Sequence, residues 1–134
     1  MRQWMVDPRI MCRKHLLGEH VEHHMFVGAI NKGTDMAGFL ANNLLEPLSL
    51  LYRHAALVEE MERRGYNHKS PLAYPNFSKG DPALLVQIDK DAAKAELVRR
   101  CPECLARYVE LLKSEQVGDL SFFNDEEHAK REIK

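Results

Sequence analysis

The hydrophobic positions of this chain recur at helical spacing, and no segment shows the strict alternation of a half-buried strand. Apolar side chains return every three or four residues from Ile10 to Ile30. Asp7 and Pro8 precede this run, and they form a good helix start because Asp can cap free N–H groups and Pro is tolerated at the first position. The pattern therefore predicts a long helix over residues 8–31.

A second apolar stripe predicts a helix over residues 47–64, which Gly65 would end. The stripe consists of Leu48, Leu51, Tyr52, Ala55, Val58 and Met61. Residues 65–82 are rich in proline and glycine, so we expect an irregular but ordered loop. Its aromatic side chains, which would fasten the loop to the core, are Tyr66, Tyr74 and Phe77.

Two shorter helices are predicted in the last third of the chain. Asp89 can cap a helix over residues 90–100, Pro102 interrupts it, and residues 103–114 are again helical in pattern. Residues 118–134 are mixed and charged, and we expect a loosely ordered tail. The predicted fold is all-α, a single compact domain of three to four helices over residues 1–134.

Composition narrows the class of protein. The chain has 134 residues, the size of one domain, and no apolar run long enough to cross a bilayer. Its N-terminus lacks the features of a signal peptide and its three cysteines are an odd number, so we expect a cytoplasmic protein without membrane partners. The net charge is −1, but Lys and Arg outnumber Asp and Glu in residues 1–79. A polyanion would therefore bind the first half of the chain.

The first predicted helix carries an unusual set of ionisable side chains. Helical spacing of three and four places His15, Glu19, Glu22 and His23 near one face. Two carboxylates and two imidazoles on one face could transfer protons or bind a metal. A solvated polar face of the helix is the alternative explanation.

Several fixed spacings in order resemble the phage endonuclease V family of pyrimidine-dimer DNA glycosylases. They are Arg2, His15-Leu-x-x-Glu19-x-x-Glu22, Phe26-x-Gly28-Ala29-x-x-Lys32 and Arg64-Gly65-Tyr66-Asn67. The similarity is dense over residues 2–33 and 57–72 and is suggestive over 86–103. It implies the endonuclease V-like helical fold and a source in a bacterial cell or a phage-infected host.

The resemblance implies a reaction as well. In that family the α-amine of the N-terminal residue attacks deoxyribose C1′, a Schiff base forms, and β-elimination cuts the strand. The family's essential glutamate matches Glu22, its arginine after the nucleophile matches Arg2, and its helix histidine matches His15. The bulky Arg2 should block removal of the initiator methionine, so we assign the nucleophile to the amine of Met1. An α-amine is less basic than a lysine side chain, which leaves a usable neutral fraction at cellular pH.

The expected substrate is duplex DNA with a pyrimidine dimer or another modified base, and we expect a monomer that needs no cofactor. Side chains predicted to contact the DNA are Arg2, Arg13, Lys14, His15, His23, Lys32, Arg64 and Lys69. The chain departs from the family at Val21 and Met25, where better-known members carry arginines, and it lacks their aromatic C-terminal segment. Fewer cations should weaken binding, because phosphate contacts dominate affinity for duplex DNA.

Cys101-x-x-Cys104 offers a second possibility. One such pair supplies half of a zinc site, and the other half could come from His20 with His24, or include the thiol of Cys12. Two packed thiols are the simpler interpretation, and we assign no metal ligand. Two alternatives to the glycosylase remain open. One is a metal-binding helical protein or hydrolase that uses His20, Glu22, His23, His24, Cys101 and Cys104, and the other is a DNA-binding relative without catalysis.

Overall fold

The computed structural model describes residues 1–68, 70–78 and 80–124, and all regular structure in these ranges is helical. The helices are α1 (Arg13–Asn31), α2 (Ala37–Ala41), α3 (Leu50–Arg63), α4 (Lys90–Arg100) and α5 (Pro102–Asn124), with 3-10 turns η1 (Pro8–Ile10), η2 (Pro47–Ser49) and η3 (Pro82–Leu85). The all-α prediction is confirmed. The short helix α2 is an addition, because it lies between the helices that were predicted over residues 8–31 and 47–64.

The predicted helix over residues 8–31 is interrupted, which the sequence pattern did not indicate. Asp7 caps η1 as expected, by accepting a hydrogen bond from the Arg9 N–H. Cys12 then adopts extended backbone angles and becomes the N-cap of α1. Its N–H donates to Sγ of Cys104, 92 residues further along the chain, at 3.2 Å. A partner for this N–H outside the helix makes the break possible, because a continuous helix would need the same donor.

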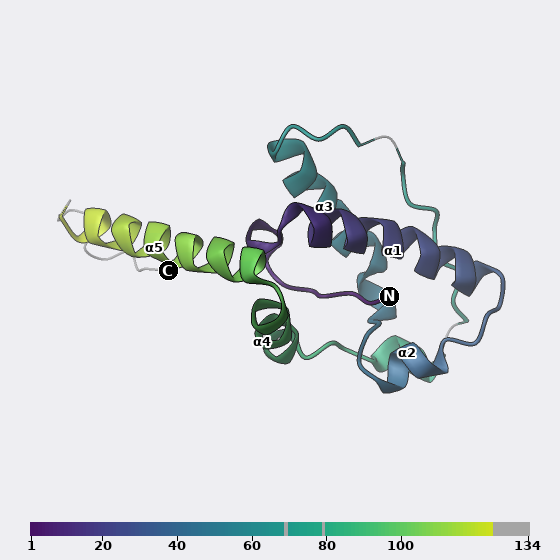
Figure 1. The fold of residues 1–134 in the computed structure, drawn as a ribbon. Coiled ribbons are helices and arrows are strands. Elements are labelled where there is room, and N and C mark those ends of the chain that lie inside the picture. Colours follow the sequence, from purple (N-terminus) through teal and green to yellow (C-terminus); the bar gives the residue numbers. More distant parts are fainter. Residues whose placement is uncertain (69, 79, 125–134) are drawn as a thin grey trace.

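Helices α1 and α3 lie beside each other, and the N-terminal segment runs along them into the centre of the molecule (Figure 1). One core cluster joins this segment to α1, α3, α4 and the start of α5; its most buried members include Ile10, Met11, Leu16, Leu57, Leu97 and Cys104. A second cluster lies toward the other end of α1 and contains Phe26, Val27, Met36, Leu45 and Leu50. Residues 3–6 are buried, and Trp4, Met5 and Val6 belong to the first cluster.

The buried face of α3 differs from the predicted stripe. Leu48 and Tyr52 are 64% and 57% exposed. The buried side chains are Leu50, Arg53, His54, Leu57, Glu60 and Met61, of which only Met61 belongs to the predicted stripe. Burial of the charged residues among them is possible because each has a partner: Glu60 pairs with Arg64, and Arg53 pairs with Glu19 of α1. A stripe chosen by hydrophobicity alone therefore pointed mostly to the exposed side of α3.

The segment after α3 is irregular in its described parts, as predicted. Tyr66 and Phe77 pack against the two core clusters, but Tyr74 is 73% exposed and does not fasten the loop. Gly65 adopts a φ of +85° directly after the end of α3, a conformation that favours glycine.

Helices α4 and α5 meet at Pro102, where the sequence predicted a break. Asp89 caps α4 by accepting a hydrogen bond from the Ala92 N–H. Helix α5 continues to Asn124, past its expected end at residue 114, and extends away from the rest of the molecule (Figure 1). The predicted loose tail therefore begins in a helix, and residues 125–134 lie outside the described part of the chain. Among the described residues, no helix is long and apolar enough to span a membrane.

Candidate functional site

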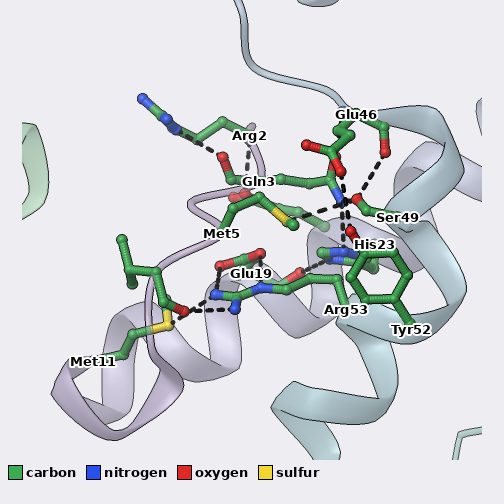
Figure 2. Close-up of polar contacts among 12 residues, drawn as sticks. Arg2, Gln3, Met5, Met11, Glu19, His23, Glu46, Ser49, Tyr52 and Arg53 are labelled. Carbon is green, nitrogen blue, oxygen red and sulfur yellow. Dashed lines mark hydrogen bonds and ion pairs between the residues drawn. The ribbon is translucent and has the colours of Figure 1, made fainter. Parts of the chain in front are cut away.

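A single buried glutamine fixes the position of the N-terminal segment. The Gln3 side chain has no exposed surface, and its amide nitrogen donates to Oγ of Ser49 at 2.8 Å and to Nε2 of His23 at 3.0 Å (Figure 2). Its amide oxygen accepts from the N–H of Glu46, and its own backbone N–H donates to the Leu44 carbonyl at 2.8 Å. Residue 3 is thereby bonded to α1, to η2 and to the segment between α2 and η2. Sequence reasoning missed this role of Gln3.

This anchor places the start of the chain against the middle of α1. The backbone N–H of Arg2 donates to Oε1 of Glu22 at 3.0 Å, and Met1 is 39% exposed. The Met1 amine is one residue beyond this bond, although the described residues include no ion pair between that amine and Glu22. A half-buried carboxylate thus lies next to a solvent-accessible chain terminus. Such a carboxylate can orient an amine and exchange protons with a bound reactant.

Two arginines approach the indole of Trp4, a residue close to this terminus in the sequence. The Arg2 guanidinium lies over the Trp4 ring at 4.0 Å from its centroid, and Arg100 at the end of α4 lies at 5.7 Å. Burial is the main cause that lowers the pKa of Arg2. Arg100 was missed by sequence reasoning, since it belongs to the half of the chain in which acidic residues are in excess. Only the packing of α4 beside the N-terminal segment brings it here.

His23 is held inside the protein rather than presented to a ligand. Its side chain has no exposed surface, so the prediction that it contacts DNA is wrong. Nδ1 donates to the Glu19 carbonyl at 2.9 Å, which leaves Nε2 to accept from Gln3. Burial lowers the pKa of His23, in agreement with a neutral ring. Its role in the structure is to hold Gln3.

Glu19 is also engaged internally. Its two carboxylate oxygens accept from Nε and Nη2 of Arg53 at 2.8 and 2.9 Å, and Nη1 of Arg53 donates to the Val6 carbonyl (Figure 2). The pair links α1, α3 and the end of the N-terminal segment. Because both side chains are almost fully buried, this pair stabilises the packing of α1 against α3 and does not form part of a surface that DNA could reach.

The other side chains predicted to contact DNA differ in whether they are exposed or engaged within the fold. Arg64 donates to the carbonyls of Met11 and Pro8 at 2.8 and 3.1 Å and pairs with Glu60, so its donors are used within the fold. Arg13 is exposed, and its guanidinium lies 4.7 Å from the centroid of the Tyr66 ring. Lys14 and Lys32 are exposed near the two ends of α1, whereas Lys69 lies outside the described residues.

The exposed face of α1 is cationic at its ends and apolar in the middle. Lys14, Val21, Met25 and Lys32 follow one another at intervals of seven, four and seven residues, so they form one stripe, and Glu22 borders it. Val21 and Met25 are 53% and 52% exposed. The stripe is about 27 Å long at 1.5 Å per residue, about the length of eight base pairs of duplex DNA.

The predicted ionisable face of α1 is divided among three environments. His15 points to three cysteines, and its Nδ1 lies 3.2 Å from Sγ of Cys12 and 3.7 Å from Sγ of Cys104. Burial, followed by the nearby charge of Arg100, lowers the pKa of His15. The sulfur atoms and this nitrogen form one group, here called the cysteine cluster, whose members are Cys12, His15, Cys101 and Cys104.

A second group, here called the histidine cluster, contains His20, His24, His54 and His68. Burial is the main cause that lowers the pKa of His20 and of His54 to about 4, so these rings are neutral near pH 7. Neither cluster includes Glu22 or His23. The ligand set of the alternative metal-binding hypothesis is therefore not assembled in this fold, because its histidines and its cysteines belong to separate clusters.

Comparison with known families decides the relationship. A family model described as pyrimidine dimer DNA glycosylase matches residues 1–74, more than half of the chain. The chain belongs to this family. No curated protein and no solved structure matches it. The family match includes Met1, Arg2 and Glu22 and ends before α4, so Arg100 and two members of the cysteine cluster lie outside it.

Loss of the Gln3 anchor should separate the terminus from Glu22. Gln3→Ala removes the bonds to Ser49, His23 and Glu46 and leaves buried polar groups unpaired, so we expect a destabilisation of about 1–3 kcal/mol. Urea denaturation measures this loss, and reductive trapping on abasic DNA measures the accompanying loss of terminus placement. The control is Gln87→Ala, because the Gln87 side chain is exposed. Equal stability and equal trapping of the two variants would contradict the anchoring role.

Proposed function

We propose that this protein is a DNA N-glycosylase with AP lyase activity, which acts on UV-damaged or otherwise modified duplex DNA through the α-amine of Met1. Membership of the pyrimidine dimer DNA glycosylase family supports the class of reaction. The observation that carries the assignment of residues is the hydrogen bond from the Arg2 N–H to the Glu22 carboxylate. It holds the first peptide bond of the chain at the one partly exposed carboxylate on the middle of α1.

The chemistry follows from an amine beside an acid. The neutral amine attacks deoxyribose C1′ of the damaged nucleotide, the bond from C1′ to the base breaks, and the base leaves with a proton. Loss of a second proton from nitrogen and opening of the sugar ring, with a proton going to O4′, give the imine. Removal of a C2′ proton then expels the 3′ phosphate by β-elimination. Glu22 is suited to these proton transfers because its protonation can alternate between steps.

The rim of the proposed site carries groups that suit a sugar–phosphate backbone. Arg2 and Arg100 lie near the Trp4 ring, and exposed Arg13 and Lys14 lie at the start of α1. Lys32 lies at the other end of the helix. We propose that duplex DNA lies along the exposed stripe of α1, with Val21 and Met25 against its sugars. Apolar contacts there would take the place of some ionic ones, which implies a weaker dependence of affinity on salt than in arginine-rich relatives.

A trapping experiment tests the proposal. Untagged protein is incubated with an abasic duplex and with UV-irradiated duplex in the presence of borohydride, which reduces the imine to a stable amine. We expect a covalent adduct with both substrates, and peptide mapping should place it on Met1. A Gly-Ser extension at the N-terminus should abolish the adduct, because it moves the free amine away from Glu22, whereas the same extension at the C-terminus should have no effect.

Other outcomes would reject the assignment in different ways. An adduct on a lysine, or an N-terminally extended protein that is fully active, would exclude the Met1 amine. Binding to damaged DNA without any adduct would favour a relative that has lost catalysis.

A further inference from the structure

We propose that the cysteine cluster is a structural zinc site, formed by Cys12, His15, Cys101 and Cys104. It joins two segments that are about ninety positions apart in the sequence: the N-cap and first turn of α1, and the junction of α4 with α5. The inference is independent of the proposed function, because it concerns metal content and not reaction.

Three of the six distances between ligand atoms are close to those of tetrahedral coordination, and all six are within 4.8 Å. Zinc bonds of about 2.3 Å to sulfur and about 2.0 Å to nitrogen place two sulfurs about 3.8 Å apart, and a sulfur and a nitrogen about 3.5 Å apart. Sγ of Cys101 lies 3.8 Å from Sγ of Cys12, and Nδ1 of His15 lies 3.2 Å from Sγ of Cys12 and 3.7 Å from Sγ of Cys104. Three cysteines and one histidine are a common ligand set of structural zinc.

Hydrogen-bond donors face the three sulfurs and would stabilise thiolates bound to a metal. Backbone N–H groups point at all three: Cys12 donates to Cys104 at 3.2 Å, His15 donates to Cys12 at 3.5 Å, and Cys104 donates to Cys101 at 3.4 Å. Cys12 caps α1 and Cys104 lies in the first turn of α5, so the positive ends of two helix dipoles meet at the cluster, while Cys101 is also the C-cap of α4. Such outer contacts orient and stabilise metal-bound thiolates.

The position of the cysteine cluster indicates what a bound ion would stabilise. The His15 ring meets the Trp4 ring edge to face at a centroid distance of 5.8 Å, and the guanidinium groups of Arg2 and Arg100 lie 4.0 and 5.7 Å from the Trp4 centroid. A zinc ion would fasten the junction of α4 and α5 to the first turn of α1, and so keep Arg100 and Arg2 near the Trp4 ring. This also explains the interruption before α1, since Cys12 must leave the helical path for its sulfur to face Cys101.

The histidine cluster carries a second inference by a separate observation. Among the described residues, the buried side-chain nitrogen and oxygen atoms without a hydrogen-bond partner are the Nε2 atoms of His20, His24, His54 and His68. One ligand atom from each of these residues lies within 4.8 Å of the others. Buried polar atoms are rarely left without partners. A single cation bound among these four nitrogens would satisfy all of them at once. We infer that they bind a late first-row divalent cation such as Zn²⁺, for which imidazole is a suitable ligand.

The four histidines come from three different parts of the chain, as is expected of an ion that stabilises the fold. His20 and His24 are one turn apart on α1, His54 faces them from α3, and His68 lies in the loop that follows α3. The ring centroids of His20 and His54 are 4.8 Å apart, and those of His20 and His68 are 4.9 Å apart. A cation bound there would hold α1 against α3 and would fix His68, and with it the start of the loop after α3, to both helices.

Metal analysis of the untagged full-length chain tests both sites, and each site serves as the control for the other. We expect bound zinc at both clusters after growth with Zn²⁺ and removal of loose metal. Cys104→Ser should lose the equivalent at the cysteine cluster and keep the other, and His54→Ala should do the reverse. With Co²⁺ in place of Zn²⁺, thiolate-to-cobalt charge transfer should appear in wild type and in His54→Ala and be absent from Cys104→Ser.

A measurement on the wild type covers the case in which a variant does not fold. Stepwise modification of the three cysteines with a mercurial should release the zinc of the cysteine cluster into a colorimetric chelator, while the zinc of the histidine cluster stays bound until the pH is lowered. Thiols that react without zinc release, or a Cys104→Ser protein with full metal content, would overturn the first inference. Full metal content in His54→Ala would overturn the second.

Discussion

Glu22→Gln is expected to lower the rates of base release and strand cleavage by about 10²–10⁴-fold, the range typical of a positioned acid–base group. The amide keeps the size of the side chain, and its oxygen can still accept from the Arg2 N–H, so the terminus should stay in place. It can no longer take or give protons at the sugar. Single-turnover cleavage of a duplex that contains one pyrimidine dimer measures the effect.

The matched control is Glu62→Gln, on the exposed surface of α3. It makes the same change of charge outside the proposed site and should leave the rate unchanged. Affinity for the damaged duplex, measured by gel shift, should be equal or higher in Glu22→Gln, because a negative charge near the phosphates has been removed. A Glu22→Gln enzyme with a wild-type rate would exclude this carboxylate from the reaction.

Arg53→Ala is expected to cause the largest loss of stability of any single substitution considered for this chain. It leaves the Glu19 carboxylate buried without its bidentate partner and frees the Val6 carbonyl, so we expect a loss of about 3–5 kcal/mol in the free energy of unfolding. Small domains have only about 5–15 kcal/mol in total, so the variant should be partly unfolded on warming. Urea denaturation at pH 7 measures the change.

An exposed pair of the same chemical type provides the comparison. Arg99 bonds to both carboxylate oxygens of Glu96 on the surface of α4, where the Arg99 side chain is 70% exposed. Arg99→Ala should therefore leave the free energy of unfolding almost unchanged, because water replaces the lost partner. If the two arginine variants were equally stable, the buried pair would not be a main support of the fold.

The family relationship could be read from the sequence, since the motif around Glu22 consists of fixed spacings within one helix and a terminus that precedes it. Local signals also predicted most helix limits correctly. Asp7 and Asp89 cap helices through their own side chains, and Pro102 interrupts one through its missing N–H. These effects act over a few residues, and a sequence pattern contains all the information that they need.

Other features depended on partners that are distant in sequence. Spacing of three and four placed His15 and Glu19 on one face of a helix, but it could not show that the first would meet Cys104 and the second Arg53. The interruption before α1 has the same origin. A helical pattern fixes the angle at which a side chain leaves its own axis, whereas the identity of the neighbour depends on how the helices pack. For buried charges and clustered ligands, that neighbour determines the chemistry.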